Sequence, residues 1–142
     1  MPVRLTLSTK YAILALEELA RRGSPASVQE LASAADIPQA YLGKLVPILV
    51  RVGILQTQRG RGGGVALARP PQEITLREII EAVEGPAALQ DCPFEVSPCR
   101  GNPKCPLYPV WDPLRDRIVG FLSQTSLAEV VARLAPKKEE GE

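Results

Sequence analysis

The sequence predicts a mainly α-helical fold with one small β-hairpin, arranged as a winged helix-turn-helix domain and followed by a long C-terminal helix. Three observations predict it: three helical segments precede Gly53, a hairpin rich in glycine and arginine follows them, and an apolar helical stripe lies beyond residue 110. A helix-turn-helix followed by a hairpin is the order of a winged helix, in which the second helix of the pair enters the major groove of DNA.

The first two helices have clear start and stop signals. Ser8 or Thr9 begins the first helix, whose apolar residues recur at helical spacing, and the segment 23–25 (Gly-Ser-Pro) ends it. Ser27 and Glu30 form a capping box that begins the second helix.

The third helix follows a tight turn at residues 36–38 and has two distinct faces. One face is apolar, with Leu42, Leu45, Val46 and Leu49; the opposite face carries Gln39, Ala40, Gly43, Lys44, Pro47 and Arg51. On the second face, Gln39 suits an adenine edge, while Lys44 and Arg51 suit guanine or phosphate. Tyr41 lies at the edge of the apolar stripe, where we expect a core residue whose hydroxyl can also contact phosphate.

Two β-prone runs, 54–58 and 65–68, predict a hairpin with a flexible basic tip between them. The tip carries Arg59 and Arg61, which can neutralise phosphates, and its glycines allow the backbone to approach DNA closely. We therefore expect Arg59, Arg61, Gly62 and Gly63 to contact DNA.

Charge is distributed unevenly along the chain. Residues 1–70 hold nine Lys and Arg against four Asp and Glu, residues 71–142 hold eight against twelve, and residues 37–72 hold no acid. Such a stretch indicates a polyanionic partner, with nucleic acid as the first candidate. A charge run is usually a solvated face, and a helix pair with a hairpin also occurs in folds that bind no nucleic acid. The two features together favour DNA.

The second half of the chain contains further helix signals. Thr75 and Glu78 form a capping box for a short helix that Gly85 ends. Asp112 and Pro113 are predicted to be the N-cap and first residue of the long helix. Its apolar stripe comprises Val110, Leu114, Ile118, Phe121, Leu122 and Thr125, and a third capping box begins at Ser126.

All three cysteines of the chain, Cys92, Cys99 and Cys105, lie in one proline-rich loop. We expect a cytoplasmic protein with reduced thiols, because the sequence shows neither a signal peptide nor an apolar run long enough to span a membrane. The spacing matches neither a zinc ribbon nor a ferredoxin, and the chain has no histidine. Three thiolates suit an iron–sulfur cluster or zinc, with a fourth ligand from elsewhere; the alternative is three free thiols.

No pattern favours an enzyme. The chain has no histidine, and the run RGRGGG lacks the Lys and Ser/Thr of a phosphate-binding loop. A small metal or redox enzyme is therefore the weakest of the interpretations.

The chain resembles the Rrf-two family of winged-helix regulators, of the IscR, NsrR, RirA and CymR type. The matching segments are RLTLSTKYAILAL at 4–16, IPQAYLGKLVPILVRVGIL at 37–55, RGRGGGVALAR at 59–69, ITLREIIEAVEG at 74–85 and WDPLRDRIVGFLSQTSLAEV at 111–130, together with the cysteine loop. The resemblance covers nearly the whole chain.

This resemblance implies a homodimeric bacterial transcription factor that binds a palindromic operator in promoter DNA, often as a repressor. It implies that the helix at about 112–125 pairs across the dimer and that Arg59 is the wing arginine. The expected divisions are a DNA-binding domain at 1–85, a cluster loop at 86–109, a dimerisation region at 110–135 and a disordered tail at 136–142.

The resemblance also implies that Cys92, Cys99 and Cys105 hold a [2Fe-2S] or [4Fe-4S] cluster that senses cluster supply, iron, nitric oxide or redox state. Tyr108 stands where IscR-like members have a histidine ligand, and Lys10 where NsrR-like members have an aspartate. The remaining candidates for the fourth ligand are Asp91, Glu95, Tyr108, Asp112, a solvent molecule or a small thiol. The alternatives are a cluster-free regulator of the CymR type, controlled by a protein partner or by thiol oxidation, and a zinc protein.

Overall fold

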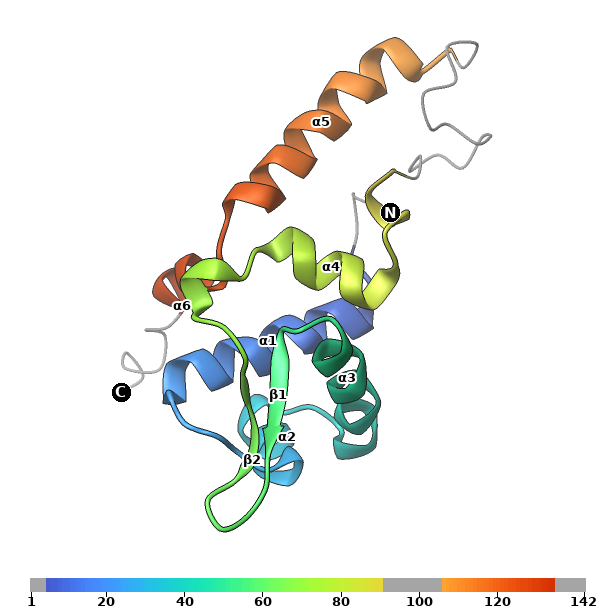
Figure 1. The fold of residues 1–142 in the computed structure, drawn as a ribbon. Helices are drawn as coiled ribbons and strands as arrows, with labels where there is room; N and C mark the ends of the chain where they lie inside the picture. The colour runs from blue at the N-terminus through green and yellow to red at the C-terminus, as the bar shows by residue number, and fades with distance from the viewer. Residues whose placement is uncertain (1–4, 91–105, 135–142) are drawn as a thin grey trace, which may run out of the picture.

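The computed structural model describes residues 5–90 and 106–134 and confirms the predicted winged-helix class (Figure 1). Within this part the elements are α1 (Leu7–Arg22), α2 (Val28–Ala35), α3 (Gln39–Arg51), β1 (Leu55–Gln58), β2 (Gly64–Leu67), η1 (Pro71–Glu73), α4 (Leu76–Glu84), η2 (Ala88–Gln90), α5 (Tyr108–Gln124) and α6 (Leu127–Leu134). Strands β1 and β2 form an antiparallel hairpin. The cysteines and the tail lie outside the described residues.

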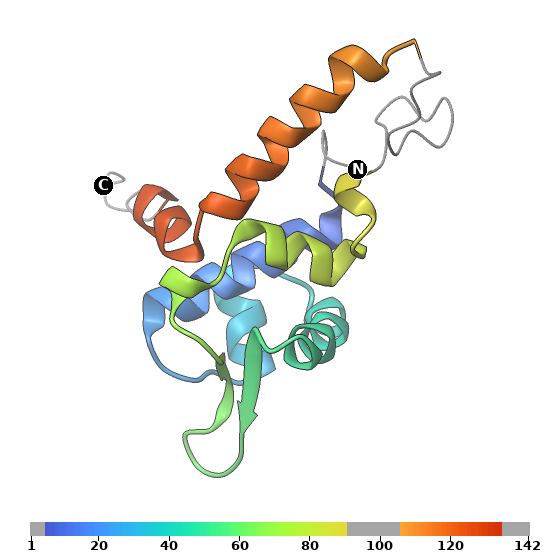
Figure 2. The same cartoon turned by 45° about the horizontal axis from the view of Figure 1, so that its top comes forward.

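Helix α5 projects from a body formed by the other elements (Figures 1 and 2). The body contains one hydrophobic core, to which α1, α2, α3, β1, β2 and α4 contribute. No helix in the described ranges is long and apolar enough to cross a lipid bilayer.

Helix starts were predicted well where a capping box was present. In α2, Ser27 Oγ accepts from the Glu30 amide and Glu30 Oε1 accepts from the Ser27 amide, both at 3.0 Å. Thr75 and Glu78 form the same reciprocal pair at the start of α4. Helix α1 begins earlier than predicted, because the hydroxyl of Thr6 caps the helix by accepting from the Thr9 amide.

The predicted start of the long helix at Asp112 was wrong, since α5 begins at Tyr108. The amide of Trp111 donates to the Leu107 carbonyl at 2.8 Å, which extends the helix by one turn. Pro109 is compatible with this first turn because its missing N–H would have no intrahelical acceptor there. Asp112 is not a cap: its Oδ1 instead accepts from Arg115 Nη2 at 2.5 Å.

The C-terminal helix packs back onto the winged-helix body. Leu127 of α6 is fully buried in the same core as α1. Thr75 and Ser126 form an isolated antiparallel bridge, in which the Leu127 amide donates to the Ile74 carbonyl at 2.8 Å. The segment after α5 therefore helps to hold α4 in place.

A further bridge attaches the hairpin to the body. Ala26, just before α2, exchanges two backbone hydrogen bonds with Val65 of β2, at 3.0 and 2.7 Å. Gly64 has φ +137°, and a Cβ at this position would lie 2.5 Å from the Ala26 carbonyl oxygen. Only glycine fits here without displacing one of the two segments.

We predict that Gly64→Ala lowers the free energy of unfolding by about 3 kcal/mol or more, because it combines backbone strain with a steric clash. Gly62→Ala is the matched control, since Gly62 also has positive φ (+78°) but a Cβ added there would have no heavy atom within 4 Å. Its cost should be only about 1 kcal/mol. Urea unfolding followed by circular dichroism measures the free energy of unfolding of each variant. Equal losses in the two variants would contradict the close packing of β2 on Ala26.

Candidate DNA-binding surface

Helix α3 has the two faces that the sequence predicted. Leu42, Leu45, Val46 and Leu49 are buried against the body. The opposite face is exposed throughout and comprises Gln39, Ala40, Gly43, Lys44, Pro47 and Arg51. The helix continues through Pro47, whose missing N–H leaves the Gly43 carbonyl without its usual donor. Both residues are solvent-exposed, so water can satisfy that carbonyl.

Tyr41 connects α3 to α1. Its side chain is half-buried, and its hydroxyl lies 2.6 Å from Ser8 Oγ. The Tyr41 ring packs edge-on against the Tyr11 ring, with 4.9 Å between the ring centroids and an interplanar angle of 84°. The predicted packing role of Tyr41 is therefore observed, and its hydroxyl is hydrogen-bonded within the protein.

The first turn of α1 also receives a side chain from α4. Glu84 Oε2 accepts from the Thr6 amide and the Thr6 hydroxyl, both at 3.0 Å, and from the Thr9 hydroxyl at 2.5 Å. Burial raises the pKa of the Glu84 carboxyl, but these hydrogen bonds outweigh burial, so that the pKa lies below the ordinary value of a glutamate. No sequence pattern predicted this contact, because 75 residues separate Glu84 from Thr9.

The hairpin carries an exposed basic tip. Gln58 pairs with Gly64, so residues 59–63 form the turn, which is closed by a 3.0 Å hydrogen bond from the Gly63 amide to the Gly60 carbonyl. Arg59 and Arg61 are both exposed and have no ion-pair partner among the described residues. The tip projects away from the body (Figure 1).

Arg69 belongs to the acid-free stretch but has an internal role. Its guanidinium donates to the carbonyl oxygens of Gly53 and Glu73, at 3.4 and 2.9 Å, and to Glu78 Oε1 at 3.3 Å. These bonds attach the end of the hairpin to the start of α4. The sequence alone did not separate this structural arginine from the exposed arginines of the tip.

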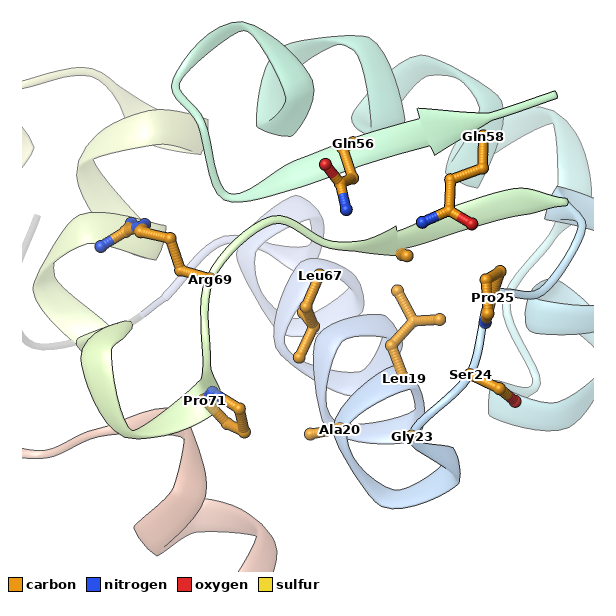
Figure 3. Close-up of a pocket in the computed structure, with 11 residues that line it drawn as sticks. Leu19, Ala20, Gly23, Ser24, Pro25, Gln56, Gln58, Leu67, Arg69 and Pro71 are labelled. Carbon is orange, nitrogen blue, oxygen red and sulfur yellow. The ribbon is translucent and has the colours of Figure 1, made fainter.

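A pocket of about 350 Å³ lies between the C-terminal end of α1 and the hairpin (Figure 3). Gln56 and Gln58 point into it from β1, opposite Leu19 of α1. Its lining contains no carboxylate and no thiol, so it lacks the acid, base and strong nucleophile that most catalytic sites need.

Cys92, Cys99 and Cys105 fall outside the described residues, as do Asp91 and Glu95. Within the described ranges, no group of three or more Cys, His, Asp or Glu side chains could hold a metal ion. Tyr108 is half-buried at the start of α5, and Lys10 is exposed on α1. Asp112, another candidate for the fourth ligand, is already paired with Arg115.

A helix with an apolar inner face and a polar, partly basic outer face, lying beside a projecting basic hairpin, defines a winged-helix DNA-binding regulator. A family model described as Rrf2, an iron-dependent transcriptional regulator, matches residues 5–133. The chain therefore belongs to the Rrf2 (Rrf-two) family, as the resemblance predicted. The family consists of transcriptional regulators, and the protein is not an enzyme.

Individual relatives agree with this assignment. The transcriptional regulator IscR of Photorhabdus laumondii is 33% identical over 131 residues, which cover 91% of this chain and 79% of the relative. The protein aau3 of Rhizobium meliloti is 39% identical over 106 residues, covering 74% of this chain and 66% of that protein.

Solved structures show the same fold. CymR, the global cysteine regulator of B. subtilis, superposes with a TM-score of 0.75 at 25% identity, covering 92% of this chain and 98% of CymR. IscR of T. potens superposes with a TM-score of 0.72 at 24% identity, covering 99% of this chain and 92% of that chain.

Proposed function

We propose that the protein is a homodimeric regulator that binds palindromic promoter DNA in the bacterial cytoplasm, and that an iron–sulfur cluster on Cys92, Cys99 and Cys105 controls this binding. The observation that carries the proposal is the exposed basic surface of α3 and the hairpin, in a chain whose three thiols lie in the segment between α4 and α5. The family description as iron-dependent supports the cluster.

In this proposal α3 enters the major groove and the hairpin tip contacts the backbone or the minor groove. Gln39 would bind an adenine edge, and Lys44 and Arg51 would bind guanine or phosphate. Arg59 and Arg61 would neutralise phosphates, while Gly62 and Gly63 would allow close approach of the tip. Tyr41 would act mainly through packing, because its hydroxyl already bonds Ser8. The small side chains elsewhere on α3 limit direct base readout.

We predict that Arg59→Ala and Arg61→Ala each weaken binding to a random-sequence duplex of about 30 base pairs. Each should also reduce the slope of log affinity against log salt by about 0.9, since one phosphate contact is lost. Arg69→Ala is the control: it removes internal hydrogen bonds and should lower the melting temperature while leaving the slope unchanged. Fluorescence anisotropy at several salt concentrations measures the affinity of each variant for the duplex and hence the slope. Wild-type slopes in both tip variants would refute a phosphate role for the hairpin.

The proposed dimer rests on α5. Its exposed apolar side chains include Val110, Leu114 and Phe121, which are 72%, 47% and 61% exposed. Their spacing of four and seven residues places them on one face of a helix that projects from the body (Figure 2). A continuous apolar stripe of this kind on a projecting helix fits pairing with a second copy of the same helix.

We predict that the double variant Leu114→Ala with Phe121→Ala weakens dimerisation by about 100-fold or more, because two large apolar side chains lose their burial. Asp116→Ala is the control, since Asp116 is exposed but lies on the opposite side of α5. Sedimentation equilibrium gives the dissociation constants. A wild-type protein that stays monomeric at micromolar concentration would refute the dimer.

The donor set fits an iron–sulfur cluster: three thiolates in a chain without histidine match the ligands that such clusters prefer. Six residues after Cys105 in the sequence, Trp111 is buried and its Nε1–H has no acceptor among the described residues. A buried donor of this kind suits an anionic sulfur site. When bound, the cluster would supply a centre that reacts with oxidants or nitric oxide.

We predict that protein purified anaerobically shows sulfide-to-iron absorption bands, with two or four irons per subunit, and that Cys→Ala at positions 92, 99 and 105 abolishes them. Operator affinity should differ roughly 5–150-fold between loaded and cluster-free protein.

A colourless, iron-free protein after reconstitution would instead favour a cluster-free regulator controlled by thiol oxidation or a protein partner, or a zinc protein. The similarity to CymR is the observation that supports the cluster-free alternative.

A further inference from the structure

Two hydrogen-bonded groups lie at the first turn of α1, one formed by Thr6, Thr9 and Glu84 and the other by Ser8 and Tyr41. We name the five residues together the α1 junction. Glu84 enters from the last position of α4 and accepts from Thr6 and Thr9. Tyr41 enters from α3 and bonds Ser8. Helices α3 and α4 are therefore both hydrogen-bonded to the same helical turn.

The geometry of this turn is tightly determined. Thr6 is the N-cap of α1, and its hydroxyl accepts from the Thr9 amide at 3.2 Å. The Thr9 side chain is fully buried. No lysine or arginine in the described ranges pairs with Glu84, so its charge is stabilised by N–H and O–H donors at the positive end of α1.

A hydrogen bond adds a directional contact to the apolar packing of α3. The contacts of Leu42, Leu45 and Leu49 are non-directional, whereas the bond between Tyr41 and Ser8 is directional. Tyr41 lies three residues before Lys44, so a rotation of α3 also moves the side chains of its outer face. A binding site functions when its groups are held within about 0.5 Å and 10–20°.

We propose that Glu84 is a positioning residue for the recognition helix: it fixes the first turn of α1, which in turn fixes α3 through Ser8 and Tyr41. Glu84 does not contact DNA in this proposal. Its effect should therefore appear in the recognition of a particular base sequence and should be absent from charge-driven binding to any duplex.

Thr9 supplies the most conservative test, because valine has the shape of threonine without its hydroxyl, while serine keeps the hydroxyl. The probe is the duplex of highest affinity that the wild-type protein selects from a random pool, and the comparison is a random-sequence duplex of equal length. Thr9→Val and Glu84→Gln should weaken binding to the selected duplex roughly 5- to 30-fold and leave random-duplex binding within about twofold. Thr9→Ser should bind like the wild type.

A double-mutant cycle tests whether Glu84 acts through Tyr41. If it does, Glu84→Gln combined with Tyr41→Phe should weaken selective binding no more than the stronger single variant does. Independent, multiplicative effects would overturn the proposal, and so would an equal loss on the selected and random duplexes. Circular dichroism at the assay temperature confirms that each variant is folded. A wild-type protein that selects no duplex would refute the proposed DNA recognition itself, not the junction.

Glu84 also lies close in sequence to the cysteines, so the α1 junction could pass a change at the proposed cluster on to α3. This step rests on the proposed function. Gly85 follows Glu84 directly, and the chain then leads to the cysteines. In Thr9→Val, the ratio of selected-duplex affinity between loaded and cluster-free protein should fall towards one. A wild-type ratio retained in Thr9→Val would show that the signal takes another route. A ratio of one in the wild type would refute cluster sensing and leave the positioning role intact.

Discussion

The burial of α1 is the constraint on which the rest of the structure depends. The helix contacts α2, α3, α4, α6 and β2. Ala12, Ala15 and Leu16 are buried on it almost completely. Two small residues on this face allow neighbouring helices to approach closely, and the leucine fills the space between them. A change in the tilt of α1 would therefore displace the recognition helix, the hairpin and the C-terminal helix together.

Directional contacts at the two ends of the core supplement this apolar packing. At one end, Ala26 and Val65 join the hairpin to the start of α2, and Gly64 is required for their approach. At the other end, the α1 junction holds α3 and α4. The hydrophobic effect makes the body compact, and the close packing of its side chains sets the arrangement of the helices. The hydrogen bonds add directional contacts beside the proposed DNA-reading surface.

Much of the fold could be predicted from the sequence because its signals are local. The capping boxes at Ser27 and Thr75 act within four residues, and the stop at Gly23 reflects a left-handed conformation that glycine adopts freely. The start of α5 was misjudged for the same reason: Asp-Pro is a strong local signal, and here the turn that precedes it is already helical. Contacts between distant residues had no comparable signal. The bond between Ser8 and Tyr41, the three donors to Glu84 and the internal role of Arg69 each depend on how whole helices pack.

The composition of the recognition helix limits how this regulator can achieve specificity. Gln39, Lys44 and Arg51 are the only side chains on the outer face of α3 able to hydrogen-bond to bases, and a good bidentate contact contributes about 1–3 kcal/mol of discrimination. In the proposed complex one subunit would therefore discriminate weakly, and the phosphate contacts proposed for the basic hairpin would add affinity that is largely independent of sequence. In a dimer, the fixed separation of two half-sites becomes the more selective property. A regulator built in this way is sensitive to any change in the relative placement of its recognition helices. The position of the three thiols between α4 and the projecting helix α5 fits that sensitivity, because α4 is bonded to the turn that holds α3 and α5 carries the proposed dimer contact.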